Sequence, residues 1–184
     1  MRYTITTQGR LTEGRNTSNK QFVQKVLIDL FDSSNWTYKF DRNVILTKNS
    51  NQTRKYTILL KEITPAQRRN DKEYRMQIRD KEISLLKDSK NNQLTSNSLF
   101  SEEILIPFGY FHDISSNVLI FSTFDPRRID SEAQTRSYYI DIEYIAKAQL
   151  EGISFFHDSA GERVISFLPT NLMGVINNMD LFFE

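Results

Sequence analysis

A polar segment in the first half of the chain carries side chains suited to reading nucleic acid bases. Residues Thr64–Arg79 read TPAQRRNDKEYRMQIR, in which a proline-led loop precedes a strand-like run. Arginine can form two hydrogen bonds with guanine, glutamine and asparagine can do so with adenine, and arginine and lysine also neutralise phosphates. The segment therefore offers base readout together with backbone positioning. The alternative is an exposed polar hairpin whose arginines pair with Asp71, Glu73 and Asp80.

A second polar segment, Asp125–Ser137, reads DPRRIDSEAQTRS and lies between the apolar run Val118–Phe124 and Tyr138–Ile140. Its acidic residues, Asp130 and Glu132, can accept a hydrogen bond from cytosine N4. The alternative is a solvated loop, but two such segments beside well-defined strands would let a small domain hold the major groove from both sides. The residues expected to contact DNA are Gln67, Arg68, Arg69, Asn70, Lys72, Arg75, Gln77, Arg127, Arg128, Gln134, Arg136 and Ser137.

The distribution of charge agrees with an anionic partner. The net charge is only +1, but residues 1–90 hold 19 basic and 10 acidic side chains, whereas residues 91–184 hold 5 and 13. Such an asymmetry between halves indicates an anionic ligand for the basic half. The alternative is that the two halves neutralise each other across one fold.

Groups that would support catalysis are scarce. The chain has no cysteine, and its two histidines, His112 and His157, have no second ligand at metal-binding spacing. A metal-dependent nuclease needs clustered carboxylates beside a lysine. The runs Asp71–Arg75 and Asp80–Glu82 come nearest, but the residue two positions after the glutamate is not lysine in either. We therefore expect no catalysis, no metal and no cofactor in this domain, with a small nuclease as an alternative.

The elements that must position the polar segments are mostly strands. Residues Glu73–Arg79 alternate polar and apolar side chains, which is typical of a half-buried strand, and Asn19–Ser33 has helical apolar spacing. Further predicted strands are Thr4–Thr7, Val44–Thr47, Tyr56–Ile63, Ile104–Phe108, Val118–Phe124, Tyr138–Ile140, Ile153–Phe156 and Arg163–Leu168, and further helices are Asp141–Gln149 and a short one from Pro169. Without βαβ alternation, this order favours a mainly antiparallel α+β or barrel-like fold.

Length and composition indicate one soluble domain. The chain has 184 residues, of which 39% are hydrophobic, enough to form a core. No signal peptide and no apolar run of membrane-spanning length is visible, so we expect a cytoplasmic protein that does not bind a membrane.

The order of these motifs resembles a known group of domains. Residues Arg68–Ile78 are followed by Ile106–Tyr110, by Val118–Pro126, by Arg136–Asp141 and by Gly152-Ile153. This order is similar to that of the B3-like DNA-recognition domains of bacterial restriction endonucleases. It is also similar to that of the N-terminal domains of McrB-type, GTP-dependent restriction proteins, with the LlaJI type as the closest match. The resemblance spans Lys55–Leu168.

The resemblance implies a seven-stranded pseudobarrel with short flanking helices and two DNA-gripping arms. The N-arm would match Thr64–Tyr74, and the C-arm would match Pro126–Ser137. It also implies that residues 1–184 form one target-recognition domain, the N-terminal part of a longer phage-defence protein. The partners would be double-stranded DNA and an AAA+ GTPase or nuclease domain or subunit of the same restriction system. The segment Met1–Thr17 has no counterpart in the family pattern.

Two alternatives to sequence-specific duplex binding remain. The first is a reader of methylated DNA that flips the modified base into an aromatic pocket. Trp36, Tyr38, Tyr138 and Tyr139 could form such a pocket, although core packing is the commoner role of such residues. The second is a module that binds another protein and no DNA.

Overall fold

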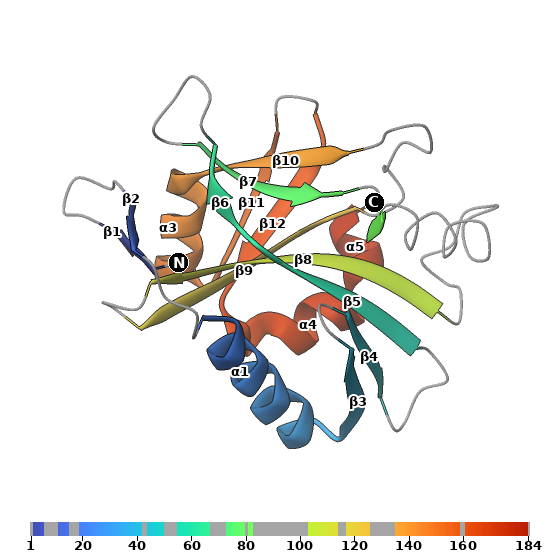
Figure 1. The fold of residues 1–184 in the computed structure, drawn as a ribbon. Coiled ribbons are helices and arrows are strands. Elements are labelled where there is room, and N and C mark those ends of the chain that lie inside the picture. Colours follow the sequence, from blue (N-terminus) through green and yellow to red (C-terminus); the bar gives the residue numbers. More distant parts are fainter. Residues whose placement is uncertain are drawn as a thin grey trace.

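The described part of the chain is organised around one large β-sheet (Figure 1). The computed structural model describes residues 2–5, 11–14, 19–41, 44–49, 55–66, 73–79, 81–82, 103–113, 117–125, 135–158 and 161–183. Within these residues the sheet has the order β11-β12-β9-β8-β5-β4-β3, and β1 and β2 join it beside β8. Its strands are β1 (Arg2–Ile5), β2 (Leu11–Gly14), β3 (Trp36–Asp41), β4 (Val44–Asn49), β5 (Lys55–Glu62), β8 (Glu103–Asp113), β9 (Val118–Phe124), β11 (Ile153–His157) and β12 (Arg163–Phe167).

A second, smaller sheet follows from the way the chain crosses between two central strands. β5 and β8 are parallel neighbours, from Lys55 opposite Glu103 to Glu62 opposite Tyr110. Parallel neighbours cannot be joined by a tight turn, so the chain between them must leave the sheet and return. On this path lie β6 (Thr64–Pro65) and β7 (Glu73–Ile78), which form an antiparallel sheet with β10 (Arg136–Asp141) in the order β10-β7-β6.

The large sheet has an apolar layer on each face. On one face it packs against the helices α1 (Asn19–Ser33), α4 (Leu172–Asn177) and α5 (Met179–Phe183), through side chains such as Leu27, Phe108 and Val175. On the other face it packs against β7, β10 and α3 (Ile142–Glu151), through side chains such as Phe111 and Met76. Figure 1 shows β7 and β10 above the central strands β5, β8 and β9 of the large sheet, and α1 and α4 below these strands.

A glycine allows the small sheet to approach the large one. A Cβ atom on Gly109 of β8 would lie 2.7 Å from Ile63 Cγ1 and 3.1 Å from Met76 Sδ. Both distances are shorter than ordinary carbon contacts, so a larger residue here would push the two sheets apart. Gly109 therefore helps to fix the height at which β7 lies over the large sheet.

The last part of the chain returns from the small sheet to the large one. Asp141 ends β10 and caps α3, because its Oδ1 accepts a hydrogen bond of 3.0 Å from the Glu143 amide. Gly152 ends the helix in the left-handed conformation, with φ of 86°. The β11–β12 hairpin follows, and a 3-10 turn, η2 (Pro169–Asn171), leads into α4.

The structure confirms the α+β class predicted from the sequence, but it does not confirm the B3-like, seven-stranded pseudobarrel. The described strands form two open sheets and no closed barrel. The predicted helix Asn19–Ser33 and strand Val118–Phe124 are confirmed with the same bounds. β3 was not predicted, although Trp36–Asp41 alternates aromatic and polar residues. Among the described residues, none of the helices has both the length and the hydropathy needed to span a bilayer.

Candidate nucleic-acid interface

The described candidate residues lie on one two-stranded ribbon, formed by β7 and β10. These strands are antiparallel, and their register pairs Gln77 with Ser137 and Arg75 with Tyr139. Residues directly opposite on neighbouring strands point to the same side of a sheet. Four residues of three kinds, a cation, an amide and two hydroxyls, therefore share one face of the ribbon.

This face points away from the core. Along β7 the residues alternate between half-buried and buried, with Tyr74, Met76 and Ile78 buried in the layer beneath. On β10, Tyr138 and Ile140 are buried in the same layer. Because successive strand residues point to opposite sides, the intervening polar residues of both strands face outward.

The two polar segments connect to opposite ends of the ribbon. Residues 67–72 join Ala66 to Glu73, which are held together by a 2.9 Å hydrogen bond from the Ala66 amide to the Glu73 carbonyl. Residues 126–134 lead into the other end, where Arg136 lies opposite Ile78. The paired part of the ribbon is six residues long, so its ends are about 17 Å apart.

Eight of the twelve predicted contact residues lie in these two segments, outside the described residues. They are Gln67, Arg68, Arg69, Asn70, Lys72, Arg127, Arg128 and Gln134. Their DNA contacts stay predictions. The described structure places the attachment points of both segments on the ribbon and brings the other four residues, Arg75, Gln77, Arg136 and Ser137, onto its two paired strands.

Arg75 lies near the middle of the outward face. It is opposite Tyr139 on β10 and opposite Thr64 on β6. Its Nε atom is buried, and no described residue accepts a hydrogen bond from it. Buried donors are nearly always paired, so we expect the acceptor of this nitrogen to come from outside the described residues.

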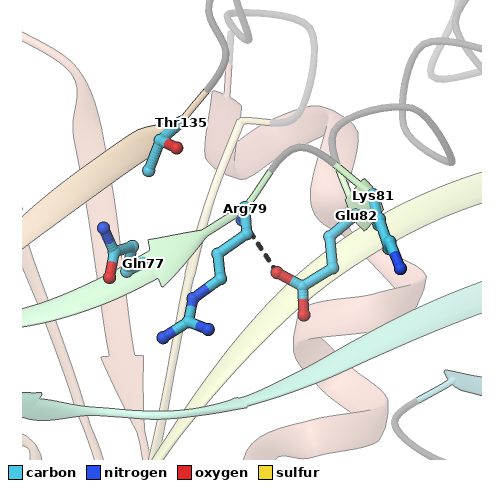
Figure 2. Close-up of a pocket in the computed structure, with 5 residues that line it drawn as sticks. All are labelled: Gln77, Arg79, Lys81, Glu82 and Thr135. Atoms are coloured by element: carbon cyan, nitrogen blue, oxygen red, sulfur yellow. Dashed lines mark hydrogen bonds between the residues drawn. The ribbon is translucent and has the colours of Figure 1, made fainter.

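A groove of about 720 Å³ opens at the end of β7 nearest the second polar segment. It is lined by Gln77, Arg79, Lys81, Glu82 and Thr135. Figure 2 shows the Arg79 side chain between those of Gln77 and Glu82. Thr135 lies just before β10, the strand that pairs with β7. Arg79 continues the period-two alternation of Glu73–Ile78, a signal visible in the sequence. Lys81 and Thr135 carry no comparable signal, and sequence reasoning did not select them.

Arg136 lies on the inner side of the ribbon rather than on its outward face. It precedes the buried Tyr138 by two residues, and its guanidinium lies 5.4 Å from the centre of the Tyr138 ring. Its Nη2 atom donates to Glu162 Oε1 at 2.5 Å. Burial lowers the pKa of Arg136, but the charge of Glu162 and contacts with Tyr138 raise it above its ordinary value. Its described contacts hold β10 in place, and a DNA contact by Arg136 stays a prediction.

The four aromatic residues considered for a base-flipping pocket do not come together. Trp36 and Tyr38 pack with α1 on one side of the large sheet. Tyr138 is buried in the layer on the other side. Tyr139 alone lies on the outward face of the ribbon, opposite Arg75. The described residues therefore contain no cage built from these four side chains.

The histidines lie apart from the ribbon's outward face. His112 on β8 is buried and stacks on Phe22 of α1, with ring centres 4.2 Å apart. His157 is an exposed residue at the end of β11. Within the part of the chain that the structure describes, no group of three histidine, aspartate or glutamate side chains could hold a metal ion.

Comparison with protein families identifies the region that contains the ribbon. Residues 54–176, well over half of the chain, match the family described as methylase-associated X1. The chain belongs to the methylase-associated X1 family. The region matched to this family begins just before β5 and includes both polar segments and both strands of the ribbon. No curated protein and no solved structure matches the chain.

Proposed function

We propose that this chain is the DNA-recognition domain of a restriction-modification system and binds specific sites on double-stranded DNA. The observation that supports this most is the arrangement of the ribbon. Both arginine-rich segments connect to β7 and β10, and the outward face between them carries Arg75, Gln77 and Ser137. Two regions far apart in the sequence thus contribute to one polar surface.

The shape of the ribbon suits the major groove. The groove of B-DNA is about 12 Å wide and admits a two-stranded β-ribbon. β6 is only two residues long and pairs with β7 at Tyr74 and Arg75 alone. Most of the outward face is therefore formed by the two strands β7 and β10. The two polar segments, attached about 17 Å apart along the ribbon, would then reach the DNA at both ends of the contact.

The side chains on this face have distinct roles in the proposal. Gln77 can form two hydrogen bonds with adenine, and Arg75 can do so with guanine. Ser137, opposite Gln77, can donate to either a base or a phosphate. The arginines and lysine of residues 67–72 and 126–134 would supply phosphate contacts and further base contacts. This division keeps the N-arm and C-arm predicted from the sequence, without the pseudobarrel.

The family assignment supports the biological setting. A domain associated with methylases serves a system in which modification and cleavage must act at the same sites, and such a system needs a reader of sequence. We propose that this domain reads DNA without cutting it, and that a nuclease, a GTPase or a methylase in the same system performs the chemistry. Tyr139 is the one proposed cage residue on the outward face, so we do not propose capture of a flipped base.

Selection of bound duplexes from a random pool tests this function. The pool is prepared in two forms, unmethylated and methylated, and incubated with the full chain at moderate salt. We expect enrichment of a short shared site in at least one form, because base contacts discriminate by about 1–3 kcal/mol each. Recovery of duplexes with no shared site, in both forms, would contradict site-specific recognition.

A further inference from the structure

We propose that the groove lined by Gln77, Arg79, Lys81, Glu82 and Thr135 binds the sugar-phosphate backbone of DNA next to the bases that the ribbon reads. This inference rests on the proposed function, because it assigns the groove to the same DNA. The predicted contact residues include only Gln77 from this groove, so the cations Arg79 and Lys81 form an additional site.

The groove has a net positive charge despite the presence of Glu82. The Glu82 carboxylate is already paired, since Lys61 Nζ lies 2.6 Å from its Oε1. Both partners of this pair are largely buried, with 16% and 17% of their side-chain surface exposed. Arg79 and Lys81 are exposed, and neither belongs to an ion pair among the described residues. Because both side chains are exposed, an anionic ligand can reach them from solvent.

Two hydrogen bonds join Arg79 to Glu82, the residues on either side of the segment that carries Lys81. The Glu82 amide donates to the Arg79 carbonyl at 2.8 Å, and the Arg79 amide donates to Glu82 Oε2 at 2.8 Å. These two bonds close a turn from Arg79 to Glu82, and the second is drawn in Figure 2. The Lys61–Glu82 ion pair ties the turn to β5 of the large sheet. Arg79 and Glu82 are therefore held in place before any ligand binds, which favours affinity.

The position of the groove favours phosphate over base contact. Arg79 follows Gln77 by two residues on the same side of the strand, so their Cα atoms are about 7 Å apart along the ribbon. With Gln77 over a base edge, Arg79 lies beyond the end of the paired strands and toward the flanking backbone. The groove also offers the Thr135 hydroxyl. Arginine, lysine and hydroxyl side chains are the usual ligands of DNA phosphates.

The salt dependence of binding tests this site. The affinity of the full chain for a duplex of mixed sequence is measured at increasing NaCl concentrations. Each neutralised phosphate contributes about 0.9 to the slope of log K against log salt. The double variant Arg79→Gln, Lys81→Gln should lower the slope by about 2, because both cations are lost. A control for the loss of a surface cation is Lys25→Gln, which removes an exposed lysine from α1, on the opposite side of the large sheet, and should leave the slope unchanged.

The outcomes separate this inference from the proposed function. A slope unchanged in the double variant, while the wild type binds, would overturn the groove assignment and leave DNA binding intact. A lowered slope without any enriched site would support the groove and contradict site-specific reading. Failure of the wild-type chain to bind DNA would contradict both the groove assignment and the proposed function. The single variant Arg79→Lys keeps both positive charges and should keep most of the wild-type slope, so that loss of charge rather than loss of the arginine side chain explains the result.

Discussion

Arg136 and Glu162 form an ion pair in which Arg136 Nη2 lies 2.5 Å from Glu162 Oε1. Arg136 is the first residue of β10, and Glu162 lies just before β12, so the pair joins the small sheet to the β11–β12 hairpin. Asp158 Oδ1 accepts a 2.9 Å hydrogen bond from the Glu162 amide, which fixes the hairpin turn. The pair therefore anchors the end of the ribbon at which the second polar segment enters.

Removal of Arg136 should destabilise the fold. The Glu162 side chain is only 10% exposed. Leaving a nearly buried carboxylate without its partner costs about 1–3 kcal/mol of stability, or more because the group is charged. We expect Arg136→Ala to lower the free energy of unfolding by that amount, measured by urea titration. The double variant Arg136→Met, Glu162→Leu removes both charges and should recover part of the loss. Equal destabilisation by the single and double variants would show that the ion pair is not the cause.

The position of Arg136 illustrates what the sequence could and could not predict. The alternation of Glu73–Ile78 has one apolar residue in every two, so β7 and its outward face follow from the sequence. In β10 the two adjacent tyrosines leave the alternation ambiguous, and a shift of one residue exchanges the two faces. The pairing of β7 with β10 also lacks a local signal, because more than fifty residues separate them. Tyr138 and Ile140 pack against the large sheet. Because Arg136 is on the same side of β10 as these two residues, their packing is what places it on the inner side of the ribbon.

Two buried tyrosines should make the protein sensitive to alkali. Burial and the charge of Glu162 raise the pKa of Tyr138 above its ordinary value of 10.0, and burial with Glu62 raises the pKa of Tyr110. Above that value the unfolded chain loses these protons while the folded chain keeps them, so stability falls as the pH rises. We expect Tyr138→Phe to reduce this slope in urea titrations above pH 10. The same slope in Tyr138→Phe as in the wild type would contradict this cause.

His112 should produce a loss of stability on the acid side. Burial lowers the pKa of His112 below its ordinary value of 6.5, although the nearby Asp113 charge acts in the opposite direction. Below 6.5 the unfolded chain binds a proton that the folded chain does not, so stability decreases as the pH falls. His112→Gln should flatten this decrease relative to the wild type. An unchanged decrease in His112→Gln would contradict the assignment.

A methyl group at Gly109 should disturb the contact between the two sheets. The added Cβ would lie 2.7 Å from Ile63 Cγ1 and 2.9 Å from its Cδ1. Overpacking of this kind lowers stability by about 1–3 kcal/mol, so we expect Gly109→Ala to reduce the urea midpoint. Gly174→Ala is the control, because its added Cβ would meet no atom within 4 Å beyond the neighbouring backbone of its own helix, α4. Alanine there should be neutral or slightly stabilising.

The central claim is that the outward face of β7 and β10 reads DNA bases. The most direct measurement is the affinity of Arg75→Ala and Gln77→Ala for the duplex enriched by selection and for versions with one base pair changed. Each variant should lose about 1–3 kcal/mol for the enriched duplex and become indifferent to the base pair at one position. The control Lys25→Ala should bind like the wild type. Unchanged affinity and unchanged base preference in both ribbon variants would contradict the account.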